Sequence, residues 1–279
     1  MNKKVSVVIP VYKPEKRVFD KLKKILNEQT IPVEIIEKWN NPEAVSMNLG
    51  IKEAKTDIVI ILAQDCIPSD KYFIEKLIKP LEDPEVVASV SDLLLPYEEW
   101  KKRPYLIRIF TINDMKLRKP SMNLSSCAYR KIDLERLGYI NENVSAIDLD
   151  FNTKIRKIGK VVRGNTVVYH LHPHYDYKKV LKTFYNYFKY NGIAVRTNGI
   201  NEHAFLQKVV RAIPFLGLAS VYYRYPLREY WYFLPMHFLF GGILDNVISV
   251  TGFWSGFFLG DEEGGSRNKE VLNNKNNLS

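Results

Sequence analysis

Apolar and polar positions alternate in blocks over the first third of the chain. Short, nearly continuous apolar runs are typical of buried parallel strands. They predict strands over residues 5–10, 33–37, 57–62 and 86–90. Between these runs the apolar residues recur at helical spacing. This spacing predicts helices over residues 16–29, 43–54 and 72–81. Regular alternation of strand and helix indicates an α/β domain.

The pattern continues less regularly as far as residue 200. Helices are expected within 98–119 and over 133–137, 150–158 and 177–190. The Val-rich segment 160–169 contains the dipeptide Gly164-Asn165. Because this dipeptide is typical of tight turns, the segment predicts a hairpin or a pair of strands.

The composition changes after residue 200. Residues 231–260 contain one formal charge, Asp245, and could cross ~30 Å of hydrocarbon as a helix. Gly241-Gly242 and Asp245 near the middle oppose a span. The mixture of aromatic and basic residues over 206–225 is typical of an interfacial helix. Interfacial or re-entrant association, a true span and a buried helical subdomain all stay open.

Three regions are therefore expected. They are an α/β domain over 1–200, a hydrophobic and amphipathic helical region over 201–260 that associates with a membrane, and a disordered polar tail over 261–279.

The charge balance bounds the class of partner. The formal net charge is +10, which suits phosphate-rich ligands or an anionic membrane surface. No nucleic-acid motif is present, so nucleic acid is not expected as a partner. The two cysteines, Cys66 and Cys127, give no disulfide framework. Since the first residues contain no signal-peptide pattern, a cytoplasmic location is expected.

Candidate metal ligands follow two predicted strands. Asp65 lies just beyond the most apolar strand, and the carboxyl ends of parallel strands are where α/β folds bind ligands. A carboxylate there can hold a divalent cation, although an Asp that caps the next helix would look the same. His170 and His172 alternate at the end of another predicted strand, so they can converge on one ligand.

A pair of carboxylates precedes a predicted helix. Asp148 and Asp150 are two residues apart. One of them could cap the helix, but two exceed what a cap requires. A carboxylate at this position could act as a general base.

Together, these motifs resemble those of the family-2 inverting glycosyltransferases, which have the Rossmann-like GT-A fold. The matching segments, in order, are residues 5–12, 48–62, 63–65, 123–130, 147–151 and 167–172. They look like the family's first strand, its N-x-G motif and following strand, D-x-D, acceptor-side loop, E-D-x-D base motif and final strand with histidine. The resemblance covers about residues 4–190 and is greatest to the rhamnosyltransferase branch.

The resemblance implies a role for each matching residue. The nucleotide-diphosphate sugar would contact Pro10, Val11, Tyr12, Asn40, Asn48, Gln64 and Asp65. The acceptor, a glycan or a lipid-linked sugar, would contact Ser126, Cys127 and Arg130. A divalent cation, Mg²⁺ or Mn²⁺, would be held by Asp65, His170 and His172. Asp148 would be the catalytic base, with Asp150 beside it. The expected enzyme acts with inversion at the cytoplasmic face of a membrane.

Three departures from the family pattern keep a second interpretation open. Ala63 replaces the first Asp of D-x-D, Ile147 replaces the Glu before the base, and residues 39–41 replace an Asp-Gly-Ser segment. A catalytically silent nucleotide-sugar binder or membrane scaffold is therefore the alternative. A nucleotidyltransferase is disfavoured, because residues 11–14 are not a Gly-rich phosphate loop.

Overall fold

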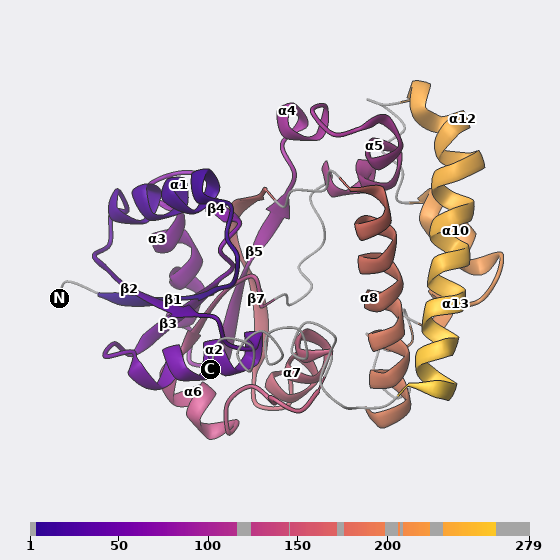
Figure 1. Ribbon diagram of the computed structural model, residues 1–279. Coiled ribbons are helices and arrows are strands. Elements are labelled where there is room, and N and C mark those ends of the chain that lie inside the picture. Colours follow the sequence, from indigo (N-terminus) through magenta and orange to yellow (C-terminus); the bar gives the residue numbers. More distant parts are fainter. Residues whose placement is uncertain are drawn as a thin grey trace, which may run out of the picture.

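A mixed β-sheet with helices on both faces forms one part of the molecule, and a layer of helices lies beside it (Figure 1). The computed structural model describes residues 4–115, 124–144, 146–171, 176–198, 206, 209–223 and 231–260.

The sheet has seven strands in the order β2-β1-β3-β6-β5-β7-β4. The strands are β1 (Val5–Val11), β2 (Val33–Trp39), β3 (Ile58–Leu62), β4 (Cys66–Pro68), β5 (Val86–Leu94), β6 (Ser126–Arg130) and β7 (Lys160–His170). β1, β2 and β3 are parallel, β6 is antiparallel to both β3 and β5, and β7 is parallel to β5. The carboxyl ends of β1, β2, β3, β5 and β7 therefore lie at one edge, next to the start of β6.

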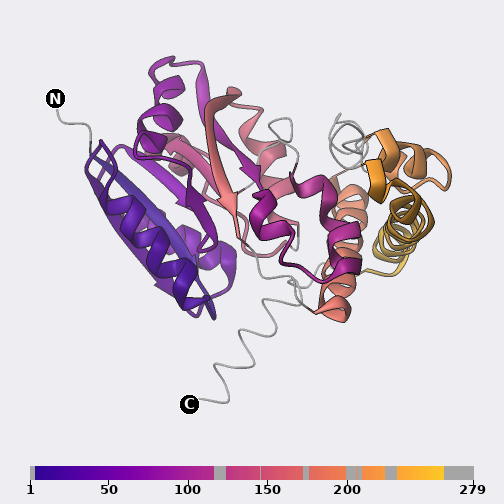
Figure 2. The same cartoon turned by 90° about the horizontal axis from the view of Figure 1, so that it is seen from above.

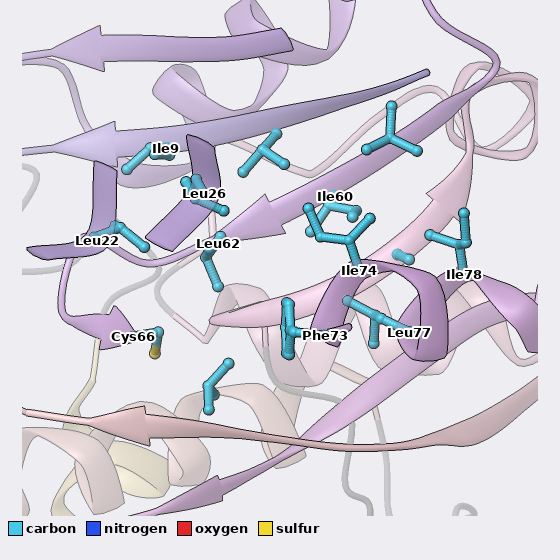
Figure 3. Packing of buried hydrophobic residues seen from close by; sticks show 14 of the residues in the cluster. Ile9, Leu22, Leu26, Ile60, Leu62, Cys66, Phe73, Ile74, Leu77 and Ile78 are labelled. Atoms are coloured by element: carbon cyan, nitrogen blue, oxygen red, sulfur yellow. The ribbon is translucent and has the colours of Figure 1, made fainter. Parts of the chain in front are cut away.

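Helices cover both faces of the sheet. The helices on the sheet are α1 (Lys16–Asn27), α2 (Glu43–Glu53), α3 (Phe73–Ile78), α6 (Lys131–Arg136) and α7 (Ile147–Ile155). Two further helices, α4 (Tyr97–Trp100) and α5 (Tyr105–Thr111), follow β5, and α5 lies next to α8 (Tyr177–Asn198; Figure 1). Short 3-10 segments follow α3 (Lys79–Glu82) and α5 (Ile112–Met115). One core lies between the sheet and α1 and α3; it includes Leu22 and Leu26 of α1, Phe73 of α3 and Ile60 of β3 (Figure 3). A second core lies on the opposite face, under α2, α6 and α7.

The N-x-G motif has a packing role. A Cβ atom on Gly50 would lie 2.2 Å from Val8 Cγ1, so only glycine lets α2 approach β1 this closely. This contact fixes the position of α2 on the sheet.

The prediction of a hairpin over 160–169 is wrong. These residues form the single strand β7, whose register against β5 shifts between the pairs Val90↔Arg163 and Asp92↔Val167. Two residues of β5 thus span the same distance as four residues of β7, which is a β-bulge. Asn165 has a φ of 49°, and a Cβ on Gly164 would lie 2.8 Å from Ser89 Oγ. Asn165 thus adopts a turn-like backbone conformation, but the chain continues as one bent strand and does not reverse its direction.

The expected loop over 123–130 is also wrong in its second half. Residues 126–130 form β6, which lies in the middle of the sheet. The remaining predicted elements exist with moved ends: β5 continues to Leu94, and the long amphipathic helix α8 spans Tyr177–Asn198.

The C-terminal layer is built on α8 and α13 (Ile243–Leu259), which run side by side (Figure 2). Its other segments are α10 (Leu216–Tyr223), a 3-10 turn (Trp231–Phe233), α12 (Leu234–Met236) and a π-helical segment (His237–Gly242). A Cβ on Gly256 would lie 1.9 Å from Lys189 O, and one on Gly252 would lie 2.8 Å from Tyr185 O. These glycines allow the two helices to pack backbone to backbone. The guanidinium of Arg196 binds the carbonyl oxygen of Gly260 at the end of α13.

Within the described residues, one helix, Leu239–Leu259, is long and apolar enough to cross a membrane by length and composition. α8, which the sequence analysis placed in the α/β domain, packs along this helix. The predicted tail over 261–279 lies outside the described residues.

Candidate active site

The end of β3 and the end of β7 meet at the carboxyl edge of the sheet. After Asp65 the chain turns into β4, which pairs antiparallel with β7 so that Cys66 is opposite His170. The amide of Leu171 donates to Asp65 O at 2.9 Å. These backbone contacts place His170 Nε2 3.4 Å from Asp65 Oδ2. The structure thus brings together two side chains that are 105 residues apart in the sequence.

The residues present fit a divalent cation. Potential ligand atoms of Asp65, Cys66 and His170 all lie within 4.8 Å of one another. Cys66 is fully buried and points into the core beside Phe73 (Figure 3), and burial raises the pKa of its thiol well above the usual range. Because the thiol points into the core, the partly exposed Asp65 and His170 are the ligands that a cation at this edge can reach. A carboxylate oxygen suits Mn²⁺ or Mg²⁺, and a neutral imidazole nitrogen is a common metal ligand. His172 lies outside the described residues.

Gln64 connects the two central strand ends. Its Oε1 accepts from the amide of Tyr12 at 2.9 Å, and its Nε2 donates to Tyr12 O at 3.0 Å. The side-chain amide therefore imitates a neighbouring strand and fixes the end of β1 against the end of β3. Gln64 thus positions Tyr12 and Asp65 relative to each other.

The other predicted donor residues on β1 and β2 lie at the same edge. Pro10 and Tyr12 are partly exposed, whereas the Val11 side chain is buried. Asn40 is exposed just after β2 and has a φ of 57°. Its backbone N–H donates a hydrogen bond of 2.9 Å to Val11 O. The structure brings these residues together at the edge that also holds Asp65.

Asn48 does not lie where a donor could reach it, which corrects the prediction for this residue. It is 4% exposed. Its Nδ2 donates to Ile140 O and to Glu142 Oε1, and its Oδ1 accepts from the amide of Ile140. The amide group is thus fully used in holding the loop that leads to α7.

Asp148 is exposed in the first turn of α7. Its Oδ1 accepts a hydrogen bond of 2.9 Å from the amide of Leu124, just before β6. Burial raises the pKa of Tyr129 on β6, and Cys127 and the Asp148 carboxylate add to this increase. Asp148 therefore lies over the middle of the sheet, on the face covered by α7.

Asp150 differs from Asp148 in its surroundings. It is 6% exposed, and its Oδ2 pairs with Lys154 Nζ at 2.8 Å, one turn further along α7. This buried, paired carboxylate is not accessible to a substrate, which corrects the prediction for Asp150 and leaves Asp148 as the candidate base.

The three predicted acceptor residues separate in the structure. Ser126 lies at the edge that holds the site, opposite Leu62, but its side chain is fully buried. Cys127 is fully buried, and Arg130 lies at the other end of β6, opposite Ile58. The Arg130 guanidinium binds Asp133 and the carbonyl oxygens of residues 81, 83, 84 and 86. The acceptor prediction is therefore wrong for all three residues, because the expected loop is a buried strand that crosses the sheet.

The sequence analysis did not single out the ion pair between Asp92 of β5 and Arg163 of β7. Arg163 Nε donates to Asp92 Oδ2 at 2.8 Å, and Arg163 Nη2 contacts the same oxygen. A carboxylate inside the apolar run of β5 is the signal that could have identified it.

Comparison with known proteins agrees with this architecture. Residues 20–137, less than half of the chain, match the sequence model of glycosyl transferase family 2. The matched part runs from α1 to just beyond α6, so it includes Asp65 and ends before Asp148 and His170. No curated protein matches the sequence.

Solved structures show the fold. The chain superimposes on the mannosyltransferase PcManGT from Pyrobaculum calidifontis, solved with GDP-Man and Mn²⁺, with a TM-score of 0.55 and 15% sequence identity over 88% of this chain and 86% of that one. A weaker likeness is to the catalytic domain of Drosophila β1,4-galactosyltransferase 7, solved with xylobiose, with a TM-score of 0.42 and 13% identity over 61% of this chain and 71% of that one. The predicted GT-A type of α/β fold is thereby confirmed, whereas the rhamnosyltransferase branch stays a prediction.

Proposed function

We propose that this chain is an inverting, metal-dependent glycosyltransferase that takes its sugar from a nucleotide diphosphate. The observation that carries the proposal is the pair Asp65 and His170 at the carboxyl edge of the sheet, within 3.4 Å of each other. The match of residues 20–137 to glycosyl transferase family 2 supports it, and so does the fold shared with a mannosyltransferase that binds GDP-Man and Mn²⁺.

On the donor side, Asp65 and His170 hold the cation, Mn²⁺ or Mg²⁺. When bound, it offsets the charge that develops on the departing nucleoside diphosphate. Tyr12, fixed by the Gln64 amide, and Asn40 border the place expected for the nucleotide. Donor positioning thus depends on backbone ends that the sheet holds rigidly, which favours the reactive geometry.

On the acceptor side, Asp148 is the base. The amide of Leu124 orients its exposed carboxylate. As the acceptor oxygen attacks the anomeric carbon, its proton passes to Asp148. The new bond between the anomeric carbon and the acceptor oxygen forms while the bond to the diphosphate oxygen breaks. A single displacement of this kind inverts the anomeric centre.

The acceptor is proposed to be a glycan or a lipid-linked sugar at the cytoplasmic face of a membrane. Apolar side chains form an exposed stripe along one side of α13 and the segment before it: Leu239, Phe240, Ile243, Val247, Phe258 and Leu259. The opposite side packs on α8, which carries Lys182 and Lys189. If α13 crossed a bilayer, these lysines would enter hydrocarbon beside it, at a large cost. The proposal is therefore that α13 lies in the membrane plane with its stripe toward the lipid.

Release of nucleoside diphosphate tests the catalytic proposal. The protein is incubated with membranes, Mn²⁺ or Mg²⁺, and dTDP-, UDP- and GDP-linked sugars. We expect release with one donor, and its loss with a chelator or with Asp148→Asn. Asparagine can still accept the hydrogen bond from Leu124, so this variant removes the base and keeps the contact. Asp20→Asn, on the exposed side of α1, is the matched control.

The outcomes separate the two functions. Tight binding of a nucleotide sugar without release from any donor would favour a catalytically silent binder, for which Ala63 and Ile147 are the relevant departures. Absence of both binding and release would contradict the proposal. Alkaline extraction tests the membrane orientation separately, because a peripheral in-plane helix is released whereas a span is retained.

A further inference from the structure

A cationic side chain is held in one orientation on the face of the sheet that carries the proposed base. Asp92 is 3% exposed at its side chain, whereas Arg163 is 41% exposed. A buried carboxylate is costly unless it is paired, so the guanidinium is kept in one orientation. Asp92 Oδ1 has no hydrogen-bond partner among the described residues, and Arg163 Nε and Nη2 both bind Oδ2.

The stereochemistry of the pair leaves donors for a ligand. A guanidinium presents five N–H groups in a fixed planar arrangement. Asp92 takes the side formed by Nε and Nη2. The end formed by Nη1 and the second N–H of Nη2 points away from Asp92, on the more exposed side of the pair. Two parallel N–H groups of this kind match the oxygens of a phosphate or a carboxylate.

The β-bulge in β7 produces this arrangement. Arg163 is the last residue in register before the bulge, and Asp92 pairs beyond it, with Val167. The bulge therefore lets the Arg163 side chain reach Asp92 along the strand. Bulges often re-aim side chains in this way. Gly164 and Asn165, the residues that suggested a turn, are thus explained by the position of one guanidinium.

The pair of Asp92 and Arg163 lies on the face of the sheet that α2, α6 and α7 cover. Val90, the partner of Arg163 in register, belongs to the core under α2, α6 and α7, and Asp92 is two residues further on the same face. α7, which carries Asp148, covers this same face, and Leu124, which binds Asp148, precedes β6, the strand next to β5. This is the face of Asp148.

We propose that Arg163, oriented by Asp92, binds an oxyanion, a phosphate or a carboxylate, on the acceptor. The assignment to the acceptor rests on the proposed function, whereas the oxyanion site itself does not. A lipid phosphate and an acidic sugar would present the same chemistry. The protein would therefore prefer a charged acceptor to a neutral one.

Binding of small amphiphiles tests the inference directly. Hexyl phosphate, hexanoate and uncharged hexyl glucoside are titrated by calorimetry into the full chain, with and without saturating GDP or UDP and Mn²⁺. We expect one of the two oxyanions to bind. Arg163→Gln should weaken that binding by roughly tenfold to a hundredfold, since hydrogen bonds to charged groups are lost. Arg163→Lys should be intermediate, because it keeps the charge and loses the planar fork.

Controls keep the result interpretable. Lys160→Gln, at the other end of β7, should leave oxyanion binding unchanged. Because Arg163→Gln leaves a buried carboxylate without its cation, the double variant Asp92→Asn/Arg163→Gln is measured as well, and it should show the same loss.

Equal oxyanion binding in the wild-type protein and both Arg163→Gln proteins would overturn the inference, as would no oxyanion binding to the wild type. Intact nucleotide binding in that case would leave the proposed function standing. Failure of nucleotide binding with oxyanion binding retained would instead contradict the proposed function alone.

Discussion

At the scale of single residues, Asn48 links the N-x-G motif to the proposed base. Its three hydrogen bonds to Ile140 and Glu142 are inside the protein. We expect Asn48→Ala to lower the free energy of unfolding by about 2 kcal/mol or more, because buried backbone groups of Ile140 lose their partner. Urea unfolding measures this. The exposed Asn27→Ala should change stability by less than about 0.5 kcal/mol, and equal effects would contradict the positioning role.

A second residue-scale prediction concerns acid stability. A hydrogen bond from Ser6 lowers the pKa of Glu34 below its ordinary value of 4.5, with the Lys55 amide adding to the effect and burial opposing it. Because the pKa of Glu34 is lower in the folded than in the unfolded protein, ionised Glu34 stabilises the fold at pH values above its unfolded pKa. This contribution is lost as the pH falls through the folded pKa.

Glu34→Gln should therefore be less stable than the wild type at pH 7, and the difference should narrow as the pH falls below about 4.3. Thermal unfolding followed by circular dichroism between pH 7 and pH 3 measures it. The exposed Glu28→Gln controls for removal of a carboxylate. A difference that stays constant over the whole range would contradict the assignment.

Residue positions were predictable where strand geometry decides them. Asp65 and His170 follow strands, and the rule that ligands lie at carboxyl ends places both at one edge. The resemblance of motifs, in contrast, failed for Asn48, Ser126, Cys127 and Arg130. Their side chains satisfy buried backbone groups or pack in the core, and a motif in one sequence does not reveal which way a side chain points.

At the scale of elements, glycine positions decide how α13 meets α8. A Cβ on Gly256 would collide with the backbone oxygen of Lys189. Gly256→Leu should therefore separate the two helices and cost about 1–3 kcal/mol or more.

Hydrogen exchange should show faster exchange in α8 and α13, with β1 to β3 unchanged. Val247→Leu, on the exposed stripe of α13, is the matched control and should leave exchange unchanged. Unaltered exchange in Gly256→Leu would show that the helices tolerate a wider separation.

Most elements were predictable because their apolar period was regular. The strand β7 was not, since Gly164 and Asn165 suit a tight turn and a bulge equally well. Only pairing with β5 on one side and β4 on the other decides between them, and that information is non-local.

At the scale of the whole molecule, the order of strands and helices was sufficient for the α/β fold, whereas the C-terminal layer was not predictable in its packing. The sequence left a span, an interfacial helix and a buried subdomain open. Among the described residues, α13 packs on α8 and on the segment 209–223, while Ile243, Val247 and Phe258 are exposed. A one-sided apolar stripe of this kind favours an interfacial helix.

This arrangement predicts how charge on the stripe affects membrane binding. Ile243→Asp/Val247→Asp should release the protein from vesicles of anionic lipid, because two carboxylates would enter the apolar side of the interface. Ile132→Asp is the matched control, since Ile132 is a 65% exposed apolar residue on α6. Sedimentation with vesicles measures the fraction of protein that is bound. Binding of the nucleotide sugar in solution should be equal in the wild type, the double variant and the control variant. If the double variant sediments like the wild type, α13 is not the membrane contact, and the basic and aromatic residues before it become the next segment to test.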